Sequence, residues 1–228
     1  MAKRIVVGDL HGDTDSLFRL LDAEQPDCLL CVGDWGDPDE IAPPIWDALL
    51  SRVPVLSVFG NHDDLLALAT LRNHSDGSPM LLAQGERREF CGLSVAGVSG
   101  IWAKTNRLPH YVTDEGVAAW ASSLAPGPTT DLLLTHGCPI GVADRTPSGR
   151  PGGQRCFLDL LRMVRPRIHL CGHLHVAQRR DLDSPPCGVL NTGSLRDGHY
   201  VILTGTGEAL KAQACRLGHG SARRPDDA

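Results

Sequence analysis

Short apolar runs alternate with amphipathic segments along the first part of the chain. Three runs have strand length, at 4–8, 27–33 and 53–60. Each is followed by a segment whose apolar residues recur at helical spacing. After the first run, Leu17, Leu20 and Leu21 share one helical face, and Asp13 or Asp15 is the expected N-cap. Strands that alternate with helices predict parallel pairing through right-handed crossovers.

The second half of the chain has a different pattern. Residues 80–100 predict strand–turn–strand with a hairpin around Gly92, and a long loop follows at 99–111. Further elements are expected as a helix near 114–124, buried strands at 130–137 and 167–173 with a helix between them, and successive strands over 178–215. The pattern therefore predicts an α/β protein with two sheets and flanking helices.

A single domain is expected over residues 1–215, because no linker or internal repeat divides them. The segment 216–228 is polar and lacks periodicity, which predicts a disordered tail.

Residues of the types that bind metals gather where the buried strands end. Five clusters do so: GDLHG at 8–12, GDWGD at 33–37, GNHD at 60–63, THG at 135–137 and GHLH at 172–175. Ligands of open α/β sheets bind at the carboxyl ends of strands, so the clusters are expected to converge. A lone Asp or His there is usually a cap or a turn residue, but five clusters together favour one shared site.

The chemistry of these residues suits metal ions. Asp oxygens and His nitrogens are ligands for zinc, manganese or iron. Residues two apart in an extended segment point to the same side, so Asp9 with His11, and His173 with His175, can act as pairs. A carboxylate shared by two cations would hold them roughly 3.5–4 Å apart, as in two-metal hydrolases.

The ordered motifs resemble those of the calcineurin-like metallophosphoesterase superfamily, in particular its small bacterial members, over residues 8–175. The resemblance implies a two-sheet β-sandwich flanked by helices in four layers, α/β/β/α. It implies one metal on Asp9, His11 and His175, a second on Asn61, His136 and His173, and Asp34 as the bridge between them. It also implies a hydroxide held between the metals as nucleophile, His62 as the proton donor to the leaving oxygen, and Asp37 as the residue that orients His62.

The expected function is that of a binuclear phosphoesterase acting on small phosphate esters, with phosphodiesters favoured over monoesters. Two divalent transition-metal ions are the expected cofactors, with manganese ahead of iron, zinc or nickel. Pro38 stands where the Ser/Thr protein phosphatases of the family carry Arg, and Asp63 where they carry Glu, so that class is disfavoured. Two alternatives stay open: a catalytically idle scaffold on the same fold, and a nuclease.

Two residues outside the motifs are candidates for substrate binding. Arg145 follows the THG motif and could contact a phosphate, although stapling its own loop is slightly favoured. His110, in the 99–111 loop, is a candidate lining residue of the substrate cleft.

Composition bears on the partners and the location of the protein. Net charge is −5, and the scattered Arg pairs give no basic footprint, so nucleic acid is not an expected partner. No apolar run reaches the roughly 20 residues of a membrane helix, and no signal peptide is recognisable, so a cytoplasmic location is expected. Among eight cysteines, Cys28 and Cys31 are expected on opposite faces of one strand as buried free thiols.

Overall fold

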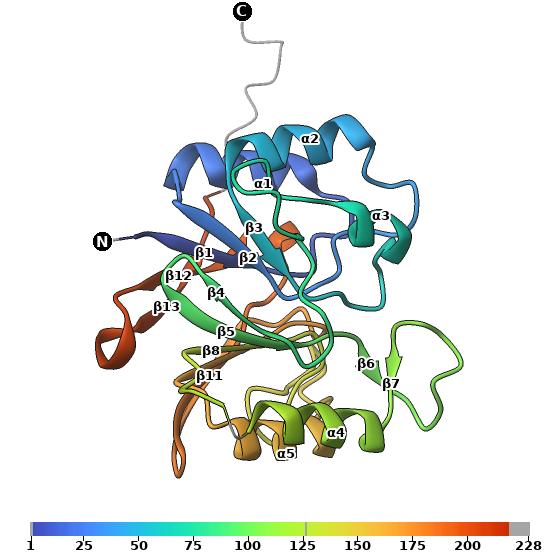
Figure 1. Ribbon diagram of the computed structural model, residues 1–228, viewed down its shortest axis with the longest axis vertical. Coiled ribbons are helices and arrows are strands. Elements are labelled where there is room, and N and C mark those ends of the chain that lie inside the picture. The colour runs from blue at the N-terminus through green and yellow to red at the C-terminus, as the bar shows by residue number, and fades with distance from the viewer. Residues whose placement is uncertain (1, 126, 219–228) are drawn as a thin grey trace, which may run out of the picture.

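The computed structural model describes residues 2–125 and 127–218, which form two facing sheets (Figure 1). The first sheet consists of β1 (Arg4–Val7), β2 (Cys28–Cys31), β3 (Val55–Ser57), β12 (His199–Thr204) and β13 (Lys211–Arg216), in the order β13-β12-β1-β2-β3. The second consists of β4 (Arg87–Phe90), β5 (Leu93–Val98), β8 (Leu132–Thr135), β9 (Ile168–Cys171), β10 (Gln178–Asp183) and β11 (Pro186–Asn191), in the order β10-β11-β9-β8-β5-β4. The predicted α/β class is confirmed.

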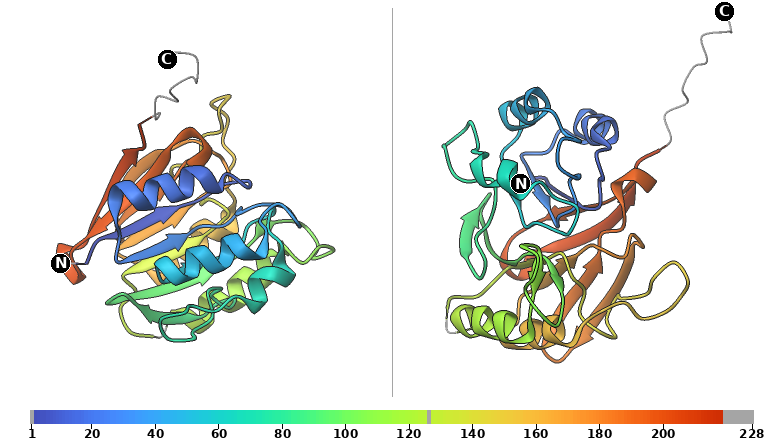
Figure 2. Two further views of the ribbon diagram at one scale, coloured as in Figure 1. Left: turned by 90° about the horizontal axis from the view of Figure 1, so that it is seen from above. Right: turned by 90° about the vertical axis from the view of Figure 1, so that its right-hand side faces the viewer.

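Helices cover the outer face of each sheet (Figures 1 and 2). The first sheet carries α1 (Thr14–Glu24), α2 (Pro43–Arg52) and α3 (Leu65–Thr70), and the second carries α4 (Asp114–Leu124) and α5 (Arg155–Val164). The layers therefore run helix, sheet, sheet, helix, which confirms the four-layer sandwich.

Alternation along the strands divides the core. Val6 packs between the two sheets, whereas Ile5 and Val7 pack under α1 and α2. Cys28 likewise faces the inter-sheet core and Cys31 the helices, and both are buried free thiols, as predicted. Because successive side chains of a strand point to opposite faces, each buried strand serves two apolar layers at once.

Local chemistry sets the helix boundaries. The Asp13 side chain caps α1 by accepting from the N–H of Ser16 at 3.0 Å. Proline at the first position starts α2 at Pro43. Helix α3 ends at Thr70, and the Asn73 side chain then pairs with both backbone groups of Val55, which ties the following chain to the first sheet.

Two segments differ from expectation. The loop at 99–111 contains β6 (Ile101–Trp102), which pairs in parallel with β7 (Tyr111–Val112). Strand β13 extends through Arg216, one residue beyond the expected domain end, because it pairs with β12 to its last residue. The rest of the expected disordered tail, from residue 219 on, lies outside the described residues. No helix within the described ranges combines the length and apolar character that crossing a bilayer requires.

Candidate metal centre

The carboxyl ends of the parallel strands of both sheets meet at one edge of the molecule. Strands β1, β2 and β3 are parallel, as are β5, β8, β9 and β11. Contacts between the motifs join the sheets there. The Asp9 carboxylate accepts from the backbone N–H of His173 at 3.0 Å, and the His136 Nδ1 lies 2.8 Å from the carbonyl oxygen of Val32. The five motifs are thus brought together, as the strand ends predicted.

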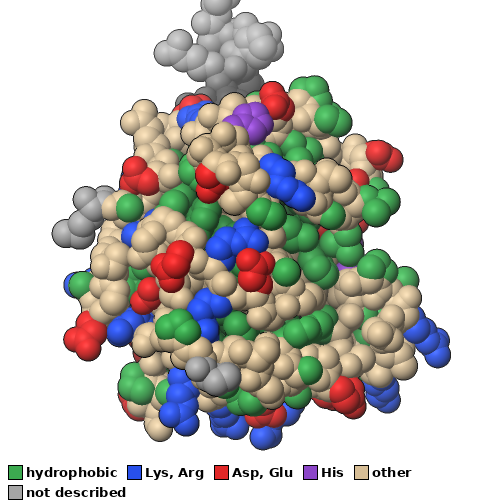
Figure 3. All heavy atoms as spheres, in the orientation of Figure 1, with side chains coloured by type: hydrophobic (Ala, Val, Ile, Leu, Met, Phe, Trp, Pro, Cys, Tyr) green, Lys and Arg blue, Asp and Glu red, His purple; other side chains and the backbone are tan. Residues whose placement is uncertain are grey.

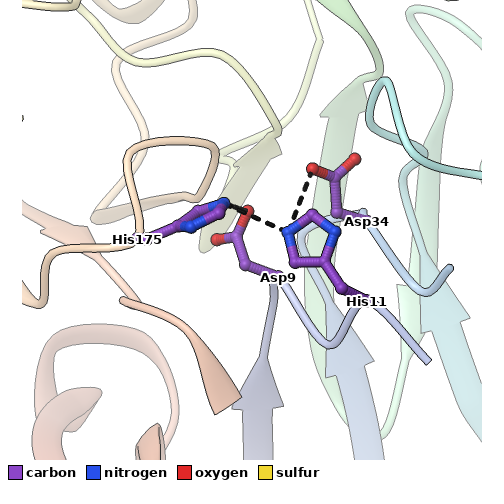
Figure 4. Close-up of side chains that lie close together, drawn as sticks. All are labelled: Asp9, His11, Asp34 and His175. Atoms are coloured by element: carbon purple, nitrogen blue, oxygen red, sulfur yellow. Dashed lines mark hydrogen bonds and ion pairs between the residues drawn. The ribbon is translucent and has the colours of Figure 1, made fainter. Parts of the chain in front are cut away.

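One group of ligand atoms comes from Asp9, His11, Asp34 and His175, which point toward one another (Figure 4). The Nε2 atoms of His11 and His175 are 3.1 Å apart. The His175 Nε2 lies 3.5 Å from Asp9 Oδ1, and the His11 Nε2 lies 3.8 Å from Asp34 Oδ2.

A second group comes from Asp34, His136 and His173, whose ligand atoms lie within 4.8 Å of one another. The His136 Nε2 lies 3.3 Å from Asp34 Oδ2 and 3.3 Å from Asn61 Oδ1. Asp34 therefore belongs to both groups, and Asn61 lies beside the second.

These donor sets fit cations. Two nitrogens that each lie about 2.1 Å from a shared cation are about 3 Å apart, which is close to the separation of His11 and His175. The bond from His136 Nδ1–H to Val32 leaves the Nε2 lone pair facing the site, the arrangement typical of a ligating histidine. Mixed Asp oxygen and His nitrogen donors suit divalent transition metals.

The backbone at these residues is strained. Five of them have positive φ: Asp9 (52°), His11 (46°), Asp34 (58°), His173 (69°) and His175 (59°). Such conformations cost about 1–3 kcal/mol each for non-glycine residues and cluster at functional sites. The turns thus direct these side chains toward one another at a cost in conformational free energy.

Burial and charge set unusual pKa values in the metal-free centre. Burial raises the pKa of Asp9 to about 7, with Asp34 adding to the effect. Burial also lowers the pKa of His173 to about 4, so its ring is neutral at physiological pH. Burial would lower the pKa of His136, but the carboxylate of Asp34 outweighs it and raises the value to about 9. The same pair lowers the pKa of Asp34 in spite of burial.

A histidine–carboxylate pair lies at the mouth of the centre. The His62 Nδ1 lies 3.0 Å from Asp37 Oδ1, and the side chains are 45% and 56% exposed. The rings of His62 and His11 are 5.1 Å apart. The Nδ1–H of His62 donates to Asp37, which leaves Nε2 as the nitrogen open to a substrate.

The sequence of residues 2–177 matches the model of a protein family described as calcineurin-like phosphoesterase. The chain belongs to that family. The prediction of a metal-dependent phosphoric ester hydrolase is confirmed at the level of the family. In direct sequence comparison, no curated protein matches the chain.

Solved structures share the fold of this calcineurin-like phosphoesterase at low identity. The TT1561 protein of Thermus thermophilus superposes with a TM-score of 0.70 at 16% identity, covering 94% of this chain and 98% of that one. A dimetal phosphatase from Danio rerio gives 0.57 at 12% identity, covering 93% and 95%. GAP50 of Plasmodium, described as the anchor in the inner membrane complex, gives 0.54 at 12%, covering 96% and 90%. At such identities the likeness concerns the fold.

Sequence reasoning missed the part that Asp63 plays in this phosphoesterase. Its buried carboxylate accepts backbone N–H bonds from Asp34 at 2.9 Å, Trp35 at 2.7 Å and Gly60 at 2.6 Å. It thus ties the GDWGD loop to the GNHD loop. The motif placed an acidic residue here, but the pattern gave no sign that its partners lie in another loop.

A sixth strand end was also missed, the NTGSLR segment after β11. The Asn191 amide donates to the carbonyl of Gly172 at 2.8 Å, and the Ser194 hydroxyl donates to the carbonyl of Asp9 at 2.7 Å. The available signal was the apolar run GVL followed by four turn-forming or polar residues. Since β11 is parallel to β9, its carboxyl end reaches the same edge.

The two candidate substrate residues lie in different settings. The Arg145 guanidinium donates to the carbonyl of Gly149 at 3.1 Å, within its own loop. This is the stapling role that the sequence slightly favoured. Burial lowers the pKa of His110, which the charges of Asp34 and His62 also influence. The carbonyl of His110 accepts from the N–H of Ile101 at 3.0 Å, and Gly100 donates to the carbonyl of Phe59 at 2.7 Å, which places the backbone of His110 beside the GNHD loop.

Proposed function

We propose that this phosphoesterase hydrolyses small phosphate esters at a binuclear metal centre and prefers diesters to monoesters. The observation that carries the proposal is the position of Asp34, whose carboxylate takes part in both groups of ligand atoms. A carboxylate common to two groups is what a bridged pair of cations needs, because one shared ligand fixes their separation.

Asp9, His11 and His175 would hold one ion, Asn61, His136 and His173 the other, and Asp34 both. When bound, the ions would lower the pKa of water and neutralise charge that develops on the phosphoryl oxygens. The oxygen and imidazole donors are compatible with manganese, iron, zinc or nickel, and we propose manganese.

His62 would donate the proton of its Nε2 to the leaving oxygen. The Asp37 carboxylate, 3.0 Å from Nδ1, would hold the orientation of the ring so that Nε2 faces the leaving oxygen. Both side chains are partly exposed, so the pair is accessible from solvent.

Charge alone does not choose between the two classes of ester. Four carboxylates lie in or beside the centre: Asp9, Asp34, Asp37 and Asp63. A diester carries one negative charge at neutral pH and a monoester close to two, but two bound cations would offset the carboxylates. The preference for diesters therefore follows the sequence motifs, and the comparison of two esters tests it. On the face drawn in Figure 3, Lys and Arg are interspersed with Asp and Glu, which does not favour the nuclease alternative.

The test is hydrolysis of p-nitrophenyl phosphate and bis-p-nitrophenyl phosphate by metal-stripped protein, with and without added manganese. We expect turnover that requires manganese, with the larger kcat/KM for the diester. Parallel assays with zinc, iron and nickel rank the metals by the kcat/KM that each supports.

The outcomes separate the alternatives. A larger kcat/KM for the monoester would reverse the substrate preference but leave the enzyme intact. No turnover of either ester by protein carrying two metals per chain would favour the scaffold alternative.

A further inference from the structure

The turn after β11 holds a short 3-10 helix, η1 (Leu195–Asp197), against the candidate metal centre. The N–H of Leu195 donates to the carbonyl of Gly8 at 3.1 Å, and the Ser194 hydroxyl donates to the carbonyl of Asp9 at 2.7 Å. These two bonds hold the loop that contains Asp9 and His11. The position of η1 relative to that loop is therefore fixed by the backbone.

Arg196 occupies the middle of η1 and is exposed. Its guanidinium forms no hydrogen bond or ion pair with another residue of the described ranges. The pKa of His11 is lowered by burial and, among smaller influences, by the positive charge of Arg196. Burial lowers the pKa values of His175 and His199, and the negative charge of Asp197 opposes that effect. Because η1 is bonded to the backbone of Gly8 and Asp9, Arg196 lies as an exposed cation beside the loop that carries Asp9 and His11.

The backbone of His110 lies beside the GNHD loop. Its carbonyl accepts from the N–H of Ile101, and the adjacent Gly100 donates to the carbonyl of Phe59, next to the GNHD loop. The charges that influence His110 are those of Asp34, His62 and His136. His110 thus lies at the part of the centre that carries Asn61 and His62.

We propose that Arg196 binds a non-bridging oxygen of the substrate phosphate and anchors the anion at the His11 side of the centre. The assignment rests on the proposed function, because it needs a phosphate ester in the site. A guanidinium presents several N–H donors in a planar fork that matches phosphate oxygens. The rings of His62 and His11 are 5.1 Å apart, so a proton donor at His62 and an anchor at the His11 side would hold the phosphate at two points.

Inorganic phosphate is the probe. Its dissociation constant is measured by calorimetry on manganese-loaded protein for the wild type, Arg196→Ala, Arg196→Lys and Arg162→Ala. Arg162 is the matched control, since it is an exposed arginine in the last turn of α5 and pairs only loosely with Asp159 at 3.8 Å. The kcat and KM for the better nitrophenyl ester, and the manganese content, are measured on the same samples.

We expect Arg196→Ala to weaken phosphate binding about tenfold and to raise KM in proportion, with a smaller change in kcat. Arg196→Lys should lie between the wild type and Arg196→Ala, because it keeps the charge and loses the fork. Arg162→Ala should match the wild type, and every variant should retain its manganese.

Two results overturn the assignment: equal phosphate affinity in Arg196→Ala and Arg162→Ala, or loss of manganese from Arg196→Ala, which would place its effect on the metals. A wild type that binds phosphate but hydrolyses neither ester would refute the proposed function, and the phosphate affinities would still decide the role of Arg196. A loaded wild type that binds no phosphate would refute both.

Discussion

The Asp63 carboxylate accepts a hydrogen bond from the backbone N–H of Asp34 at 2.9 Å, across 29 residues of chain. Two further backbone N–H groups, of Trp35 and Gly60, donate to the same carboxylate. The residue shared by both groups of ligand atoms is thus held in place by a neighbouring acid that itself binds no metal in the proposed scheme.

Asp63→Ala should lower the free energy of unfolding of the metal-free protein by about 3 kcal/mol, because three backbone N–H groups lose their acceptor. The measurement is urea denaturation at pH 6, below the pKa of about 7 that burial gives Asp63. At that pH the change reports on hydrogen bonds rather than on a buried charge. Asp64→Ala is the control, since Asp64 caps α3 and its loss should cost about 1 kcal/mol. Equal losses in the two variants would argue against a special role for Asp63.

Asp34→Asn should remove the bridge. We expect fewer than two manganese ions per chain after dialysis and a fall in kcat/KM of at least about 100-fold, because the amide carries no negative charge to share between two cations. Metal analysis and ester hydrolysis measure both effects. Asp144→Asn is the control, because this buried carboxylate also accepts backbone N–H bonds but lies in the loop 141–153. Retention of both metals and full turnover in Asp34→Asn would refute the bridging role.

His62→Ala should slow hydrolysis in proportion to the basicity of the leaving group. The loss of a general acid costs about 10²–10⁴-fold when the leaving oxygen needs a proton. A p-nitrophenolate leaves without one, so its ester should lose much less than the corresponding methyl ester. Comparing the two esters measures the effect. His74→Ala is the control, because His74 forms another exposed pair with Asp47 at 3.3 Å. An equal loss for both esters would exclude proton donation as the role of His62.

The sequence predicted the fold and the candidate centre through one regularity, a buried strand followed by a ligand-bearing turn. Asp9 and Asp34 follow neighbouring strands of the first sheet, so their convergence could be inferred from parallel pairing. His136 follows a strand of the second sheet, so its approach to them depended on how the two sheets face each other. The two-sheet arrangement followed from the break in the pattern between residues 80 and 100 and from the resemblance.

The supporting contacts could not be predicted in the same way. Asp63 acts on a loop 29 residues away, and Ser194 on one 185 residues away. No periodicity encodes which backbone group a side chain will reach across a sheet. Arg196 was overlooked for a related reason, since its turn comes from a strand at the far end of the chain. The bond from the N–H of Val55 to the Asn73 side chain likewise joins two segments that the pattern does not link.

Raising the pH from 6 to 8 should tighten manganese binding. Ligation requires an ionised Asp9 and a neutral His136, but burial raises the pKa of Asp9 to about 7, and Asp34 outweighs burial to raise that of His136 to about 9. Protons therefore compete at His136 below pH 9 and at Asp9 below pH 7. His173, with a pKa of about 4, adds no competition in this range.

The overall constant for binding both ions should rise roughly tenfold per pH unit between 7 and 8, where His136 loses a proton. It should rise more steeply between 6 and 7, where Asp9 at the other ion loses one as well. Titration of the metal-free protein against a fluorescent chelator of known pH dependence gives the values. Asp9→Asn is the informative comparison, because its amide has no proton to lose. It should bind more weakly but with a shallower slope between pH 6 and 7. A wild-type affinity that stays constant from pH 6 to 8 would mean that neither Asp9 nor His136 releases a proton when manganese binds, which would contradict the raised pKa values of both residues.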